Sequence, residues 1–236
     1  MTTDLPTPAQ PLRIGTRGSP LALAQAHETR GRLMAAFDLP EAALEIVVIK
    51  TTGDDRSLID ADIALKTLGG KGLFTKEIEE DMLSGKIDIA VHSMKDMPVV
   101  QPPGLLLDTF LPRQDVRGAF GSLHHDSLAA LPEGAVVGSS SLRRRAQLAA
   151  RRPDLRLVEF RGNVQTRMKK LGDGVADATF LAMAGLRRLG LTEVVKSAIA
   201  PEDMLPAVAQ GAIGIERRAD DLRAAAMLEA IHDIPT

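Results

Sequence analysis

Cysteine, tryptophan and tyrosine are all absent from this chain of 236 residues. Without cysteine the chain has no disulfides, no thiolate metal sites and no thiol nucleophiles. Its six phenylalanines are the only aromatic residues, so platforms for stacking nucleic-acid bases are scarce. No apolar run approaches the ~20 residues needed to cross a bilayer. These absences argue against a disulfide-stapled, base-stacking or membrane-spanning protein.

The net charge is also small, since 29 basic and 31 acidic residues give −2. Apolar residues make up 44% and charged residues 25%, the balance of an ordinary globular protein. Residues 1–6 lack the basic and apolar regions of a secretory signal. We therefore expect a cytoplasmic protein with neither a membrane nor a nucleic acid as its partner. We also expect a monomer.

Strand-like and helix-like segments alternate, which predicts an α/β fold with mainly parallel or mixed sheets. In the first half, strands are expected at residues 12–16, 44–50, 87–91 and 105–111, and helices at 20–37 and 73–83. A second run has strands at 135–138, 155–159 and 178–182, with helices at 145–152, 164–171 and near Leu186. A last strand at 212–216 and a helix at 219–231 complete the pattern.

Proline-containing segments at residues 112–115 and 205–207 are candidate crossings between two lobes. The first lobe would hold residues 1–111 and 207–236, and the second residues 112–206. Two α/β lobes joined by two crossings form a cleft that can close on a ligand. The patternless stretch 52–70 is long enough to be a functional loop.

The segment from Gly138 to Arg145 predicts an anion site. It carries Ser139, Ser140 and Ser141 and then three arginines, between an expected strand and an expected helix. Backbone N–H groups at a helix start lack intrahelical partners and attract negative charge. Arginine adds a planar fork that binds carboxylate or phosphate with two hydrogen bonds.

Basic residues continue beyond this turn, with ten against two acidic residues from Arg143 to Lys170. One alternative is a solvated basic helix face, and another is a nucleic-acid groove. The overall acidity and the scarcity of aromatics disfavour the groove. The Ser-rich turn and a later Arg161-Gly162-Asn163 turn favour a small polyanionic ligand.

A second candidate site follows the strand at residues 87–91, because ligands of open α/β sheets bind beyond the carboxyl ends of strands. Here Lys95 and Asp96 stand side by side before Pro98. Asp96 would hold a developing cation and Lys95 an anion, although an exposed ion pair is the alternative.

Two further turns lead into helices and carry cations. Arg17 and Ser19 precede the first helix, and Lys71 lies in a Gly-rich turn before the second. That turn is no Walker A loop, because Leu65 stands where the first glycine is required.

Six segments, in order, resemble hydroxymethylbilane synthase, also called porphobilinogen deaminase. They are Thr16-Arg17-Gly18-Ser19-Pro20-Leu21-Ala22-Leu23, Gly69-Gly70-Lys71-Gly72-Leu73-Phe74, Val91-His92-Ser93-Met94-Lys95-Asp96-Met97-Pro98, residues 138–144, Arg161-Gly162-Asn163 and Gln210-Gly211-Ala212-Ile213-Gly214. The resemblance runs from about Leu12 to Ile231.

This resemblance implies two lobes like those of periplasmic binding proteins, with the active site between them. It implies a transferase of porphyrin and tetrapyrrole (haem) biosynthesis that joins four porphobilinogens, each losing ammonia, into linear hydroxymethylbilane. By motif position, Asp96 is the catalytic aspartate. The residues implied to bind substrate and cofactor carboxylates are Arg17, Ser19, Lys71, Lys95, Ser139, Ser140, Ser141, Arg143, Arg144, Arg161, Arg167 and Arg188, with Gln210 as a further candidate. No metal is implied.

The chain departs from the family pattern in two places. The family has a third domain, in which a cysteine anchors a dipyrromethane cofactor, whereas this chain ends near where that domain would begin and has no cysteine. A second family lysine aligns at Thr67, with Lys66 beside it as a candidate substitute. We expect either the enzyme, cut short or holding its cofactor non-covalently, or a binding module for acidic pyrroles without turnover.

Overall fold

The computed structural model describes residues 4–52 and 74–236. Within them, residues 4–52, 74–114 and 212–236 form one compact unit, here called unit 1, and residues 115–211 form unit 2. The chain passes between the units at residues 114–115 and 211–212. The first passage lies within the expected crossing segment 112–115, and the second follows the expected segment 205–207 by a few residues.

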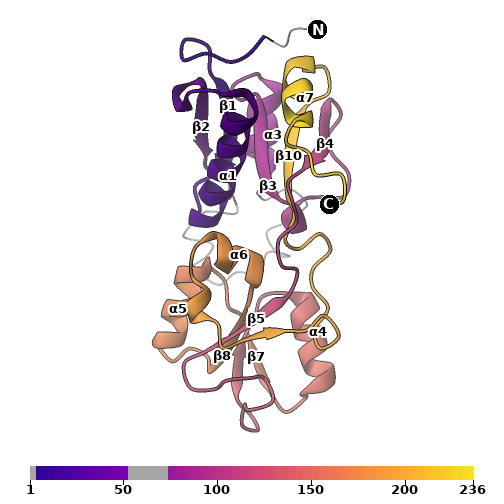
Figure 1. Ribbon diagram of the computed structural model, residues 1–236. Helices are drawn as coiled ribbons and strands as arrows, with labels where there is room; N and C mark the ends of the chain where they lie inside the picture. The colour runs from indigo at the N-terminus through magenta and orange to yellow at the C-terminus, as the bar shows by residue number, and fades with distance from the viewer. Residues whose placement is uncertain (1–3, 53–73) are drawn as a thin grey trace. The chain divides into compact units, whose positions relative to one another are not determined.

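Unit 1 is built on a sheet of five strands in the order β2-β1-β3-β10-β4 (Figure 1). The strands are β1 (Leu12–Arg17), β2 (Leu44–Ile49), β3 (Ile89–Ser93), β4 (Leu105–Phe110) and β10 (Ile213–Arg218). β1 is parallel to β2 and β3, whereas β10 is antiparallel to both β3 and β4. The last strand of the chain therefore belongs to the first sheet.

Helices cover both faces of this sheet. The helices are α1 (Pro20–Phe37), α3 (Lys76–Leu83) and α7 (Leu222–Glu229). Side chains of α1 and α7 pack with Ile89, Val91 and Ile215 in one core. Ile78 and Met82 of α3 belong to a second core. Alternate residues of β3 and β10 thus face different helices, as the pleat of a strand requires.

Unit 2 repeats the arrangement, with five strands in the order β7-β6-β8-β5-β9. They are β5 (Gly118–Ser122), β6 (Val136–Gly138), β7 (Arg156–Val158), β8 (Ala178–Ala182) and β9 (Ser197–Ile199), with helices α4 (Leu142–Arg151), α5 (Val164–Gly172) and α6 (Met183–Arg188). β6 is parallel to β7 and β8, and β5 is antiparallel to β8 and β9. In each unit, the strand that runs antiparallel to both of its neighbours (β10 in unit 1, β5 in unit 2) is the first strand after the chain enters that unit from the other.

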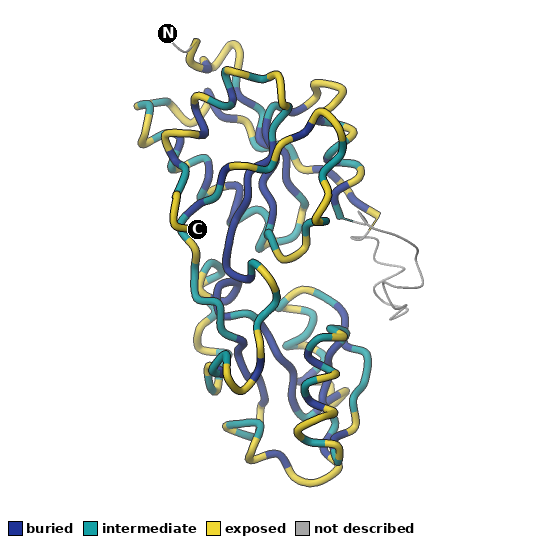
Figure 2. Tube along the Cα trace, turned by 90° about the vertical axis from the view of Figure 1, so that its right-hand side faces the viewer, coloured by how far each residue is buried: buried dark blue, intermediate teal, exposed yellow. Residues whose placement is uncertain are grey.

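Aromatic packing marks the centre of unit 2. Phe120 of β5 lies opposite Phe180 of β8, and the ring centroids are 5.8 Å apart in an edge-on arrangement. Leu148 of α4 packs into the same core, whereas Leu186 of α6 belongs to a core with Ala119 and Leu181. Figure 2 shows the buried residues concentrated along the strands inside each unit.

Side-chain caps explain where several helices begin. Ser19 accepts a hydrogen bond from an α1 backbone N–H, and Pro20 occupies the first helical position. Ser141, Asn163 and Asp221 do the same for α4, α5 and α7. An N-terminal cap of this kind typically contributes ~1 kcal/mol.

The predicted α/β class with mixed sheets is confirmed, but some elements differ from the expectation. α4 begins at Leu142 rather than Arg145, so the three arginines lie inside its first turns. α7 begins at Leu222 rather than at residue 219. Strands β5 and β9 and three short 3₁₀ turns, Glu41–Ala43, Met94–Asp96 and Thr192–Val194, were not expected. None of the helices within residues 4–52 and 74–236 has the length and apolar composition of a bilayer span.

Candidate functional site

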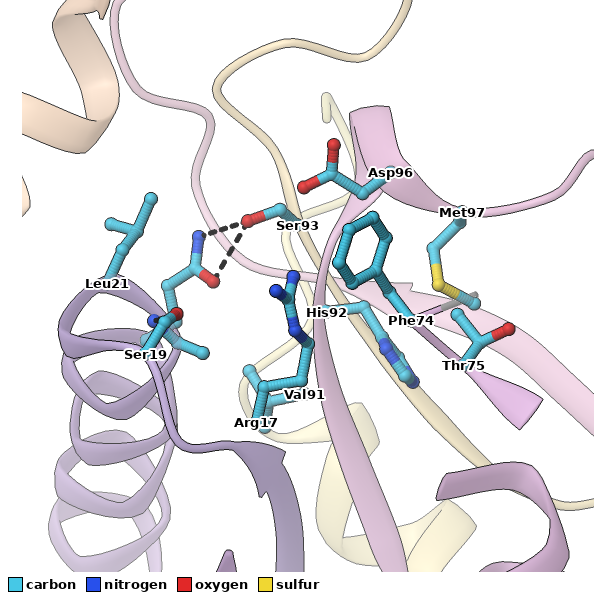
Figure 3. Close-up of a pocket in the computed structure, with 12 residues that line it drawn as sticks. Arg17, Ser19, Leu21, Phe74, Thr75, Val91, His92, Ser93, Asp96 and Met97 are labelled. Atoms are coloured by element: carbon cyan, nitrogen blue, oxygen red, sulfur yellow. Dashed lines mark hydrogen bonds between the residues drawn. The ribbon is translucent and has the colours of Figure 1, made fainter. Parts of the chain in front are cut away.

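A pocket in unit 1 lies beyond the carboxyl ends of β1 and β3, where the sequence predicted a site. Arg17 ends β1, and Ser93 ends β3. The pocket is lined by Arg17, Ser19, Leu21, Ala22, Gln25, Phe74, Thr75, Val91, His92, Ser93, Asp96 and Met97 (Figure 3). Three of the predicted site residues, Arg17, Ser19 and Asp96, are thus brought together.

Asp96 lies on the 3₁₀ turn Met94–Asp96, directly after β3. Asp96 and the neighbouring Lys95 are both exposed, and only Asp96 lines the pocket. In Figure 3 the Asp96 carboxylate, the Ser93 hydroxyl and the Arg17 guanidinium face the same space. The turn therefore presents a carboxylate that a cationic ligand group can reach.

Contacts from neighbouring elements fix the pocket walls. The Arg17 guanidinium stacks over the Phe74 ring at 4.0 Å from its centroid, a cation–π contact. Gln25 of α1 donates to the Ser93 hydroxyl at 2.9 Å, and that hydroxyl lies 3.0 Å from the Gln25 amide oxygen, within donating reach. Ser19 caps α1 by accepting the Ala22 N–H at 3.3 Å, so its O–H is left to donate elsewhere.

The three serines of unit 2 follow β6 and each accepts a backbone hydrogen bond. Ser139 accepts the N–H of Ser141 at 3.3 Å, and Ser140 accepts the N–H of Phe160 at 2.8 Å. Ser141 accepts the N–H of Arg144 at 3.4 Å. Since a hydroxyl can accept and donate at once, the fold uses the oxygen lone pairs and leaves three O–H donors for an anion.

Arg144 is the buried centre of this cationic region. It is 7% exposed, and its guanidinium donates to the carbonyls of Phe180 and Leu181, at 2.7 Å each. Its Nε has no hydrogen-bond partner, and no carboxylate of the described chain forms a salt bridge with it. Burial lowers the pKa of Arg144 to about 9, and the charges of Arg167 and Arg143 add to the effect. A buried cation without a carboxylate favours an anionic ligand.

The other predicted arginines lie around the same strands. Arg143 donates to the carbonyl of Leu205, and burial lowers its pKa. Arg167 donates to Gly162 at 2.8 Å and, at 3.5 Å, to the Phe180 carbonyl that Arg144 also uses. Arg161 is 5% exposed. Arg188 donates to the Gly211 carbonyl at 3.1 Å.

Gln210 is also buried, and its amide donates to the carbonyls of Val116 and Arg117 at 2.6 and 3.3 Å. It therefore ties the two crossing segments together inside unit 2. Lys71 and the candidate Lys66 lie outside the described residues. In the part of the chain that the structure describes, no group of three His, Cys, Asp or Glu side chains is arranged to hold a metal ion.

His92 and Glu216 form a buried pair that was not predicted from the sequence. Their Nε2 and Oε2 atoms are 3.1 Å apart, and the two side chains are 5% and 0% exposed. They are 124 positions apart in the chain. The one sequence feature that could have indicated the pair is that Glu216 follows the motif Gln210 to Gly214 by two residues.

Comparisons with known proteins identify relatives of the chain. The family model for the dipyrromethane cofactor-binding domain of porphobilinogen deaminase matches residues 12–226. Porphobilinogen deaminase of Paracoccus denitrificans is 68% identical over 231 residues, which are 98% of this chain and 72% of that protein. Chloroplastic porphobilinogen deaminase of rice (Oryza sativa subsp. japonica) is 58% identical over 212 residues, or 89% of this chain and 58% of that protein.

Solved structures bear on the fold alone. A periplasmic substrate-binding protein of an ABC transporter from Coxiella burnetii superimposes with a TM-score of 0.51 at 14% identity, covering 94% of this chain and 92% of that one. This likeness confirms the predicted resemblance to periplasmic binding proteins.

Proposed function

The chain belongs to the porphobilinogen deaminase family, and from that premise we propose that it acts as a hydroxymethylbilane synthase. In that reaction four porphobilinogens join head to tail, each losing ammonia, to give linear hydroxymethylbilane. Because the chain spans 72% and 58% of the two relatives' lengths, the activity of the whole protein is itself part of the proposal.

The observation that carries this proposal is the position of Asp96 on the wall of the unit 1 pocket. When the protonated aminomethyl group of porphobilinogen leaves as ammonia, the remaining methylene-pyrrole is a cation. We infer that the Asp96 carboxylate stabilises this cation through the pyrrole N–H, as preorganised charge stabilises charge that develops in a transition state. The next pyrrole carbon then attacks and loses its proton, which Asp96 can help to move.

The arginines of unit 2 supply the second half of the proposal. Each porphobilinogen carries an acetate and a propionate, so the growing product is a polycarboxylate. Arg143 and Arg144, with the O–H groups of the three serines, offer charged and neutral donors to these carboxylates. Carboxylate binding would also offset the burial and the repulsion from Arg167 and Arg143, which together lower the pKa of Arg144. We assign the same role to Arg17, Ser19, Lys71, Lys95, Arg161, Arg167 and Arg188.

The same donors fit the dipyrromethane cofactor of the family model, which also bears carboxylate arms. Arg144 is suited to the cofactor because its guanidinium is buried away from water and its Nε has no hydrogen-bond partner in the described chain, so it can bind a carboxylate. When bound, the cofactor supplies the pyrrole position to which the first porphobilinogen adds. This chain has no cysteine, so its own residues can hold the cofactor only by non-covalent contacts.

That absence of cysteine also supports a second function, in which the chain binds acidic pyrroles without turning them over. The two functions differ in one measurable step, the release of ammonia. We further propose that the protein is a cytoplasmic monomer that acts without nucleic acid or membrane, which cell fractionation and light scattering test.

The test is to incubate the chain with porphobilinogen and synthetic dipyrromethane, then quantify ammonia and hydroxymethylbilane. We expect slow conversion with four ammonia molecules per bilane, because a non-covalently held cofactor can leave after any addition. Pyrrole binding without ammonia would support the second function instead. No binding of either pyrrole would refute both.

A further inference from the structure

The His92 and Glu216 pair lies inside unit 1, on the sheet face that α3 covers. In the register of β3 and β10, His92 lies opposite Gly214 and Ala90 lies opposite Glu216. The two side chains therefore share one face, diagonally across the strands. Figure 3 shows the His92 ring on the other side of the β3 strand from Ser93.

A third ionisable group joins the pair from the helix above it. Burial raises the pKa of Glu79 of α3, and the negative charge of Glu216 adds to the rise. The Oε1 atoms of Glu79 and Glu216 are both buried without a hydrogen-bond partner in the described chain. The surrounding side chains include Ile78, Met82 and Ala90, which form an apolar core.

Buried ionisable groups such as these contribute little to the stability of the fold. The Glu216 carboxyl and the His92 imidazole lose their hydration in the interior, with the half-buried Glu79 beside them. Apolar residues of similar volume often replace buried ion pairs at no loss of stability. Strongly buried ionisable groups beside a pocket are more typical of functional sites.

The pair is connected to Asp96 through the strand end and the turn that follows. His92 is two residues before the turn Met94–Asp96, whose Met94 N–H donates to the Ala212 carbonyl at 3.1 Å. Gly214, opposite His92, makes room for Met94, because a Cβ there would lie 2.2 Å from the Met94 sulfur. The segment Ala212 to Gly214, at the start of β10, therefore contacts and supports the turn that carries Asp96.

We propose that Glu216 is a positioning residue, which fixes His92 and the end of β3 and so aims the Asp96 carboxylate into the pocket. The proposal rests on the function proposed above for Asp96. The proposal assigns a role to the segment after Gly211, although no residue of that segment is proposed to contact the reacting pyrroles.

The test compares Glu216→Gln with Asp88→Asn in the full chain. Gln keeps the volume of Glu but removes its charge. Asp88 is the matched control because it accepts hydrogen bonds from Arg13 at the opposite end of β3, at 2.8 and 3.0 Å. Amide hydrogen exchange at Met94 and Met97 reports the order of the turn independently of activity, and steady-state kinetics separate kcat from KM.

For Glu216→Gln we expect exchange at these two amides to rise roughly tenfold, with little change elsewhere in unit 1. We expect kcat to fall about 10- to 100-fold at unchanged KM, because small displacements of a reacting group have effects of that size. Asp88→Asn should lower the denaturation midpoint and leave both quantities at the turn unchanged.

Unchanged exchange at the turn in Glu216→Gln would overturn the proposal, as would unchanged kcat in an active parent. A general rise in exchange across unit 1, matched by Asp88→Asn, would instead assign the pair a purely structural role and overturn it too. A parent chain that forms no bilane refutes the proposed function, and the exchange comparison then still decides the positioning role.

Discussion

Replacing Asp96 by asparagine is the sharpest perturbation of the proposed chemistry. The side chain is exposed on a short turn, so the change of one oxygen for an amide leaves no buried group without a partner. The shape and one acceptor oxygen are kept, while the second oxygen becomes an NH2 donor and the charge opposite the cationic intermediate is lost. We expect folding and pyrrole binding to be preserved and bilane formation to fail.

The size of the effect follows from the position of the carboxylate. Opposite unit charges about 4 Å apart interact by about 4 kcal/mol at an effective dielectric constant of ~20, which is typical near a protein surface. Salt and solvent reduce this value for an exposed group such as Asp96. The loss of one such contact typically costs ~2.7–4 kcal/mol, and we expect a rate lower by about 10²–10³.

Single-turnover ammonia release, measured at saturating porphobilinogen, isolates this step from binding. The matched control is Asp108→Asn, an exposed carboxylate on β4 that pairs with Arg217 at 2.6 Å and lies outside the pocket lining. The control should retain the parent rate. Ammonia release by Asp96→Asn at near the parent rate would refute the catalytic role of Asp96.

Four further substitutions test other parts of the account. Arg143→Leu or Arg161→Leu should weaken pyrrole binding and make the remaining binding less salt-sensitive. If titrations show unchanged affinity in both variants, these arginines do not bind the ligand, and the alternative of a basic face without a ligand is favoured. Asp115→Asn should cost about 1 kcal/mol at pH 7 after allowance for solvent screening, because hydrogen bonds from Arg117 lower the pKa of Asp115 to about 2. This stabilisation is present above pH ~4 and is lost as the pH falls towards 2, so the variant's unfolding midpoint in urea should converge with the parent's in acid. Gly138→Ala should destabilise unit 2 by ~1–3 kcal/mol in urea, since the new Cβ would lie 2.4 Å from the buried Phe160 ring, and an unchanged midpoint would show that the ring can move.

Much of the fold was predictable because strong local signals agreed with the tertiary structure. Helix α1 has proline in its first turn and a serine cap before it, and its predicted bounds match the structure. Strand β5 was missed because its sequence, Gly-Ala-Phe-Gly-Ser, has two glycines, no β-branched residue and no polar alternation. The start of α4 was predicted three residues late because the serines were assigned to an anion-binding turn, whereas Ser141 caps the helix and α4 begins at Leu142.

The candidate site was predictable in its residue types but not in its geometry. Local motifs placed Arg17, Ser19 and Asp96 at strand ends, and they meet in one pocket. The sequence did not show that Arg144 is buried and Arg143 half-exposed. The available sign was that Arg144 and the buried Leu148 are one helical turn apart and so lie on the same face of α4. The His92 and Glu216 pair required knowledge that the last strand returns antiparallel beside β3.

The central claim is that the residues of this chain form a site for acidic pyrroles that holds dipyrromethane without a covalent bond. Mass spectrometry of the chain mixed with dipyrromethane, under native and then denaturing conditions, tests it most directly. The account predicts a native mass raised by one dipyrromethane and a denatured mass equal to that of the 25.2 kDa chain. A mass increase that survives denaturation, or a native mass that never rises, would contradict it.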